Sequence, residues 1–168
     1  MAMPSAILKE LLVAAQVGTF GLQTQVLLDD DTEDLLDDSA DQLLADMNSA
    51  ANWSILISKL PDRPNNCIAL FDGGGLAPDP KWLLDFPDVN ILIRAARYEA
   101  AYFKAKQVQD ALLGVDSQDL LGDRLVSVTQ IGNTSFVGRD DKDRPTFSIT
   151  LRLIIEPGAS ALTNREPL

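Results

Sequence analysis

Residues 70–80, LFDGGGLAPDP, form the stretch most suggestive of chemistry, because three consecutive glycines lie between two aspartates. Glycine-rich loops can bind phosphate, but a P-loop needs the pattern GxxxxGK[ST], in which the lysine and hydroxyl reach phosphates and magnesium. The stretch continues into lysine without that spacing and without the hydroxyl. Pro78 and Pro80 prevent a helix from starting directly after the glycines, and Pro78 stands where the pattern GxGxxG needs its last glycine. The sequence therefore argues against a nucleotide site here.

The rest of the composition excludes several classes of catalytic site. The 168 residues include no histidine and one cysteine, Cys67. This chain therefore holds no serine–histidine or cysteine–histidine nucleophile, no histidine-ligated or thiolate zinc site and no intrachain disulfide. Cys67 lies in the apolar run CIALF, which predicts a buried structural thiol. Asp72, Asp79 and Asp85 could pair as carboxylates, but we expect them to face solvent, and we predict no enzyme, no cofactor and no metal site.

Nine acidic residues crowd one short segment that contains no basic residue. They are Asp29, Asp30, Asp31, Glu33, Asp34, Asp37, Asp38, Asp41 and Asp46. The net charge of the chain is -11, and it is only -2 without these nine. Apolar residues recur at helical spacing through the segment, which predicts a helix with a solvated acidic face. An EF-hand starting at Asp29 fails, because Asp34 stands where glycine is needed and Ala40 where glutamate is needed. The chain also lacks the basic footprint of a nucleic-acid binder.

Helical periodicity predicts two further helices. In residues 5–16, apolar positions repeat at helical spacing and Ser5 can act as the N-cap. This segment is amphipathic, lacks the basic start of a signal peptide, and is too short to cross a membrane. In residues 97–113 an alanine-rich stripe predicts packing on a sheet, with Lys104 on the solvent side.

Strand-like runs complete the predicted fold, and PDRPNN between the first two predicts a turn. The strands are expected at 53–60, 67–72, 89–95 and 124–132, with a hairpin at 134–157. We therefore expect an α+β fold, a mostly antiparallel β-sheet with α-helices packed on one face. The predicted organisation is a single domain over residues 1–157, with an acidic helical insert at about 22–50 and a C-terminal tail at 158–168.

The loop between the strands at 67–72 and 89–95 is long for a simple connection, and loops of this length are usually functional or disordered. Its large apolar residues do not suit a solvated loop. Two interpretations stay open: these residues fold back on the core, or they anchor a contact between subunits. The candidate interface residues are Asp72, Gly73, Gly74, Gly75, Pro78, Asp79, Pro80, Trp82 and Phe86.

The ordered set of motifs over residues 53–157 resembles the tailed-bacteriophage tail terminator family, also labelled minor capsid protein. The set comprises the turn LPDRPNN, the strand and loop CIALFDGGG, the segment PDP, the strand VNILIR and the hairpin VGRDDKDRPTFSITLRLIIEP. The resemblance implies a structural virion protein that forms a ring, a hexamer in this family. Such a ring caps the tail tube and joins it to the head-completion proteins of the neck. It also implies assembly in the host cytoplasm, with DNA passing through the lumen without specific binding.

The acidic segment at about 22–50 departs from the pattern expected of this family. Two locations stay open for it, the outside of the ring and the lumen, where negative charge would keep DNA from adhering. Other functions also stay open: another head–tail connector, a tail tube protein with the same order of elements, or an acidic soluble binding module.

Overall fold

The structure, a computed structural model, describes residues 2–20, 53–158 and 165–167. The acidic segment predicted as a helix at about 22–50 lies outside the described residues. Two helices and seven strands are described, in the order α1 (Pro4–Ala14), β1 (Thr19–Phe20), β2 (Ser54–Ile57), β3 (Cys67–Asp72), β4 (Asp88–Arg94), α3 (Tyr98–Leu112), β5 (Gln118–Leu120), β6 (Asp123–Arg139) and β7 (Pro145–Glu156).

The strands form one mixed sheet in the order β1-β2-β3-β4-β7-β6-β5. The pairings from β3 to β5 across this order are antiparallel, but β1 and β2, and β2 and β3, run parallel. The predicted α+β class is therefore confirmed in outline: four of the six pairings between the described strands are antiparallel, but the sheet is mixed rather than purely antiparallel. The turn predicted at 61–66 is instead part of a crossover, because a parallel strand must start at the same end as its neighbour.

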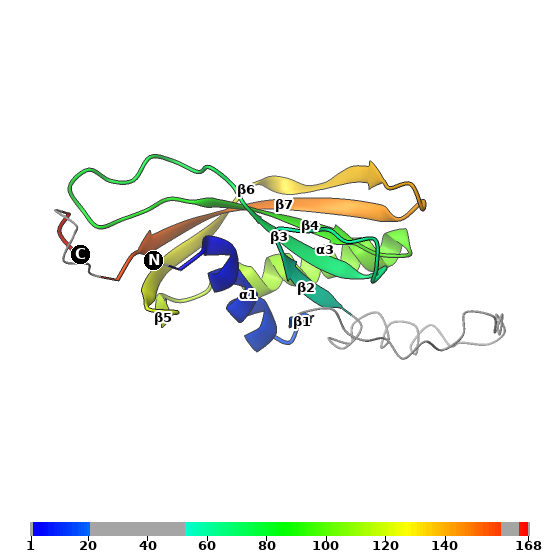
Figure 1. The fold of residues 1–168 in the computed structure, drawn as a ribbon, viewed down its shortest axis with the longest axis horizontal. Coiled ribbons are helices and arrows are strands. Elements are labelled where there is room, and N and C mark those ends of the chain that lie inside the picture. The colour runs from blue at the N-terminus through cyan, green and yellow to red at the C-terminus, as the bar shows by residue number, and fades with distance from the viewer. Residues whose placement is uncertain (1, 21–52, 159–164, 168) are drawn as a thin grey trace.

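Both helices cover the same face of the sheet (Figure 1). Alternate residues of the central strands point to this face and are fully buried, as Val89, Ile91 and Ile93 of β4 show. The apolar face of α1 and the alanine stripe of α3 close the core over them. The helices were therefore correctly predicted, and α3 ends at Leu112, within one residue of the predicted boundary.

Lys104 lies on the buried side of α3, which contradicts the prediction that it faces water. Its Nζ donates hydrogen bonds to the carbonyl oxygen of Val17 at 3.1 Å and to Oε1 of Gln107 at 2.6 Å. It also lies 4.9 Å from the ring centroid of Trp53. Burial lowers the pKa of Lys104 to about 8. A long stem can follow an apolar surface to polar partners, so helical spacing alone did not identify this position.

β6 and β7 form a long hairpin that joins two elements predicted separately. The strand expected at 124–132 and the first half of the hairpin expected at 134–157 are one strand, β6. Its register on β7 shifts between Ile131 and Ser135, among other places. Such irregularities bend a strand and strengthen its twist. The alternation of buried and exposed residues is therefore interrupted within β6, although the strand itself continues to Arg139.

Candidate functional site

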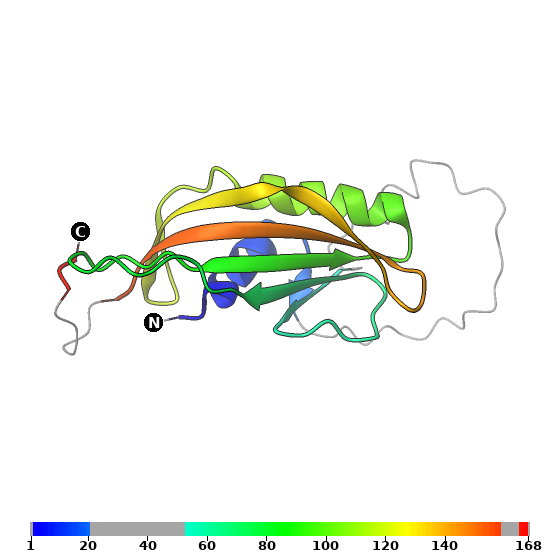
Figure 2. The same cartoon turned by 90° about the horizontal axis from the view of Figure 1, so that it is seen from above.

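The loop between β3 and β4, residues 73–87, is an ordered two-limbed projection, which we call the arm. The N–H of Gly73 donates to the carbonyl of Asp88 at 2.7 Å, that of Leu76 to Phe86 at 2.9 Å, and that of Asp79 to Leu84 at 2.9 Å. These bonds continue the β3–β4 ladder outward. The arm extends past the end of the sheet, at the left of Figure 2. Because these N–H groups are bonded within the arm, they are not available to hold a phosphate.

The three glycines of the arm differ in what their positions demand. Gly75 has a φ of +75°, and a Cβ there would overlap the carbonyl oxygen of Phe86 on the opposite limb. Only glycine suits both the left-handed backbone and the close approach of the two limbs. At Gly74 an added Cβ would meet nothing within 4 Å. Gly75 is therefore needed to build the arm, whereas Gly74 leaves open space on its surface.

Asp79 shapes the tip of the arm. Its Oδ1 accepts the backbone N–H groups of Lys81 at 2.8 Å and of Trp82 at 2.7 Å. This is the local side-chain turn for which aspartate is favoured before such a bend. These hydrogen bonds hold the pKa of the Asp79 carboxyl below its ordinary value, and the bond from Trp82 contributes most. The carboxylate therefore fixes the bend that presents Trp82.

Two carboxylates fix the base of the arm. Asp72 accepts both the backbone N–H and the hydroxyl of Ser5, each at 2.8 Å. Asp88 forms a bidentate pair with Arg152, at 2.8 and 3.1 Å, which raises the pKa of the guanidinium. The prediction that Ser5 caps its own helix is wrong, because the helix begins at Pro4 and Ser5 lies inside the first turn. Asp72 satisfies one of the N–H groups that such a turn leaves unpaired.

The apolar residues of the arm divide between the two interpretations left open by the sequence. Leu83 is 3% exposed, so this part of the arm folds back on the body. Leu84 and Phe86 are half-buried. Leu76 and Trp82, in contrast, remain 54% and 38% exposed. The arm thus exposes two large apolar side chains, Leu76 on its first limb and Trp82 near its tip.

A second exposed apolar surface, which we call the aromatic cluster, lies where α3 begins. Tyr98 and Tyr102 pack edge-on against Phe147, with ring centroids 5.1 and 5.8 Å apart, and Phe136 and Phe103 extend the cluster. All of these rings except Phe147 are 40–51% exposed. Sequence analysis missed this surface. The spacing of Tyr98 and Tyr102 puts them on one face of a helix. Phe136, however, belongs to β6, and only the tertiary structure brings it against Tyr98.

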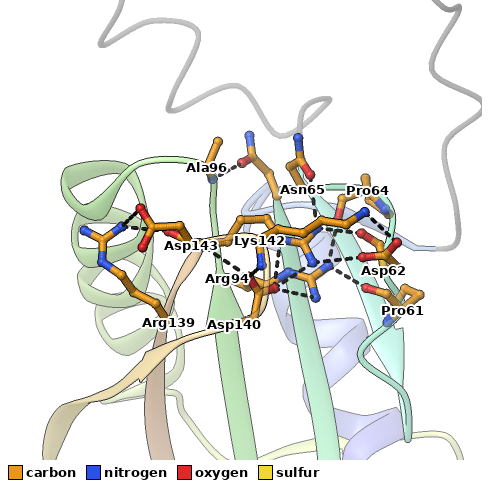
Figure 3. Close-up of polar contacts among 12 residues, drawn as sticks. Pro61, Asp62, Pro64, Asn65, Arg94, Ala96, Arg139, Asp140, Lys142 and Asp143 are labelled. Atoms are coloured by element: carbon orange, nitrogen blue, oxygen red, sulfur yellow. Dashed lines mark hydrogen bonds and ion pairs between the residues drawn. The ribbon is translucent and has the colours of Figure 1, made fainter.

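The tip of the β6–β7 hairpin is tied to the crossover between β2 and β3 by a network of charged residues (Figure 3). Arg144, which is buried, donates to Asp140 at 2.8 Å and to Asp62 and Asn65 of the crossover at 2.5–3.2 Å. Arg94 of β4 donates to crossover carbonyls at 2.5 and 2.9 Å. The hydrogen bond from Arg144 lowers the pKa of Asp140 to about 2. This network is structural, because its charged groups contact one another and the crossover backbone, although the buried Nε of Arg94 has no hydrogen-bond partner among the described residues.

Comparison with known protein families shows which family this chain belongs to. Residues 22–157 match the family described as bacteriophage tail terminator protein. The chain belongs to the bacteriophage tail terminator family. Members of this family are structural proteins of the phage particle, and the resemblance noted in the sequence is thereby confirmed. The matched range begins at residue 22, so it includes the acidic segment that the sequence analysis treated as a departure from the family.

One solved structure supports the fold independently. The chain is similar to a chain of the structure titled "Virion of native gene transfer agent (GTA) particle", with a TM-score of 0.50 and 23% sequence identity. The alignment covers 70% of this chain and 87% of that chain. No curated protein sequence matches the chain. At this level of identity the similarity to the particle shows a shared fold.

The carboxylates considered for catalysis in this tail terminator family member have separate structural partners. Asp72 bonds to Ser5, Asp79 to the arm backbone, and Asp85 to Arg165 at 2.7 Å. Asp85 is only 6% exposed, so the expectation that it faces solvent is wrong. Cys67 is fully buried, and burial raises the pKa of its thiol, which keeps it unreactive. Across the ranges that the structure describes, histidine, cysteine and acidic residues form no group of three suited to a metal ion. Neither described helix is long and apolar enough to traverse a bilayer.

Proposed function

We propose that this protein is the tail terminator, or tail completion, ring protein of a tailed bacteriophage. In this role it caps the tail tube and joins it to the head-completion proteins of the neck. Family membership supports the role, and the observation that carries it is the arm. This ordered projection presents Leu76 and Trp82 to solvent, and tryptophan is enriched among the residues that contribute most to binding near the centre of protein interfaces.

A closed ring of identical subunits needs two different surfaces that fit each other, since its contacts are head to tail. The arm lies at one end of the elongated molecule, and the aromatic cluster lies near the hairpin end, on the opposite side of Figure 2. We assign the arm tip and the aromatic cluster to the two sides of the subunit contact. The expected assembly is a hexamer, as in the family that the sequence resembles.

The charge of the chain suits a channel for DNA that passes without being held. Nine acidic residues of the segment at 29–46 carry most of the net charge of -11, and they oppose adhesion of the phosphate backbone if this segment lines the lumen. Specific DNA binding is therefore not part of the proposed role.

The experiment combines the purified protein with the tail tube protein of the same phage. Light scattering and electron microscopy should show short closed rings and tubes whose growth stops when the protein is added. Long fibres formed by the protein alone would indicate a tube subunit instead. A strict monomer that does not bind tube protein would contradict the proposal.

A further inference from the structure

The last described residues, 165–167, lie alongside the tip of the arm and pair with it through one isolated β-bridge. The N–H of Leu83 donates to the carbonyl of Glu166 at 2.6 Å, and the N–H of Glu166 donates to the carbonyl of Lys81 at 2.9 Å. Trp82 and Glu166 form a parallel bridge. Residues far apart in the chain therefore share backbone hydrogen bonds at the point where Trp82 is presented.

An ion pair reinforces this pairing. The Arg165 guanidinium lies 2.7 Å from Oδ1 of Asp85, and the same nitrogen donates to the carbonyl of Leu84 at 3.3 Å. The Asp85 side chain is only 8% exposed, and the ion pair with Arg165 offsets the cost of burying its carboxylate. The backbone of Asp85 is also paired with Ile155 of β7, at 2.8 and 3.0 Å. Asp85 thus links the sheet, the arm and the C-terminal residues.

The other end of the C-terminal segment is also anchored. The N–H of Gly158 donates to Oδ1 of Asp123 at 2.7 Å, and the carboxylate of Asp123 also accepts the N–H of Ala2. A Cβ at Gly158 would lie 2.5 Å from the carbonyl oxygen of Gly122, so the chain leaves β7 through a tight passage that favours glycine. Gly158 is therefore fixed to the body at the end of β7.

The first limb of the arm is held by its backbone hydrogen bonds to the second limb, such as that from Leu76 to Phe86, rather than by burial. Residues from Gly73 to Pro78 are exposed, and the arm tip is fixed to the remainder through Leu83, the bend at Asp79 and the pairing with residues 165–167. Segments with few buried contacts open with small free energies. Residues 165–167 consequently supply a large part of what keeps the tip in one pose.

We propose that residues 165–167 act as a strap that holds the arm in its projecting pose, and that strap and arm tip together form one composite docking surface. The occupant of this surface is a second copy of the chain, so this inference rests on the proposed ring function. Removing the strap leaves the sheet and helices intact, but it frees Trp82 from its fixed position and weakens subunit association.

The test uses the full chain and two variants, Arg165→Ala and a chain ending at Gly158. Hydrogen exchange at the Leu83 amide should become about tenfold faster or more in both, because its acceptor is loosened or lost. Exchange at Ile91 and Ile149 in the central strands should stay unchanged. Ring formation should need at least about tenfold more protein, since binding then has to order the arm.

A matched control removes a different arginine–aspartate pair. Arg139→Ala loses the contact with Asp143, at 3.2 Å, near the hairpin tip. It should leave exchange at Leu83 unchanged. Unchanged exchange at Leu83 in Arg165→Ala and in the shortened chain would overturn the strap, and so would rings that form as readily as those of the original protein. If the original protein forms no rings, the proposed function fails, while the exchange comparison still decides whether the strap holds the arm.

Discussion

Asp72 and Ser5 are joined by two hydrogen bonds of 2.8 Å, one to the backbone N–H and one to the hydroxyl of the serine. This contact ties the first turn of α1 to the last residue of β3, from which the arm leaves the sheet. A residue first considered for chemistry thus positions a helix.

Replacing Asp72 with alanine should therefore destabilise the fold. Loss of a capping carboxylate and of its hydroxyl bond costs about 1–2 kcal/mol. For a chain of this size that corresponds to a fall in melting temperature of roughly 2–8 °C. Thermal unfolding followed by circular dichroism measures the change. Asp116→Ala, at an exposed position, is the control, and an equal effect of both variants would contradict the assigned role.

Substitution by valine should destabilise the fold at Gly75 but hardly at all at Gly74. Gly75→Val forces a side chain into the Phe86 carbonyl and into a left-handed backbone, which costs at least about 1–3 kcal/mol. Gly74→Val has open space and should change the free energy of unfolding by less than about 0.5 kcal/mol. Under the proposed function Gly74→Val still impairs ring assembly, because Gly74 is one of the candidate interface residues of the arm and the new side chain projects from its surface. Denaturant unfolding and light scattering separate the two effects, and identical unfolding curves for both variants would refute this account of the arm.

Trp82→Ala should affect assembly much more than folding. The indole is 38% exposed in the lone chain, so its removal costs little there, whereas the loss of an interface tryptophan typically costs 2 kcal/mol or more of binding energy, or roughly thirtyfold in affinity. The measurement is the protein concentration at which rings form, alongside the melting temperature. Leu121→Ala is a matched control, because Leu121 is 55% exposed but lies outside both proposed surfaces. Normal rings from Trp82→Ala would show that the arm tip is not the contact.

The network at the hairpin tip predicts a defined pH dependence. The pKa of Asp140 is lowered from 3.8 to about 2, mainly by the hydrogen bond from Arg144. A lowered pKa in the folded state means that the contribution is fully present above about pH 4 and is lost as pH falls towards 2. Asp140→Asn should lose about 1–2 kcal/mol at neutral pH, after allowance for the partial exposure of the carboxylate. The stability difference from the original protein should shrink between pH 4 and 2, and a constant difference would contradict the assignment.

The sequence predicted the local structure of the described residues well, because the periodicities of α3 and β4 are regular and their buried faces are apolar throughout. It could not predict the parallel pairing of β2 with β3. The hydrophobic pattern of a strand reports which of its faces is buried, not the direction of its neighbour. A turn-rich connection such as 61–66 is equally compatible with a hairpin and with a short crossover.

The arm illustrates a second limit. Its glycines and aspartates were found by type, but their roles depend on partners distant in sequence, such as Ser5 for Asp72 and Arg165 for Asp85. The buried position of Lys104 was missed for the same reason, since its acceptor, the carbonyl of Val17, lies in another element. Spacing along the chain carries no information about such contacts.

The central claim is that the protein closes the end of a tail tube as a ring. The most direct measurement is cryo-electron microscopy of tail tubes assembled in its presence, at side-chain resolution. The account predicts a single closed ring at the tube end, with Trp82 of each subunit buried against the aromatic cluster of its neighbour. Tubes without a terminal ring, or a ring in which Trp82 faces solvent, would contradict it.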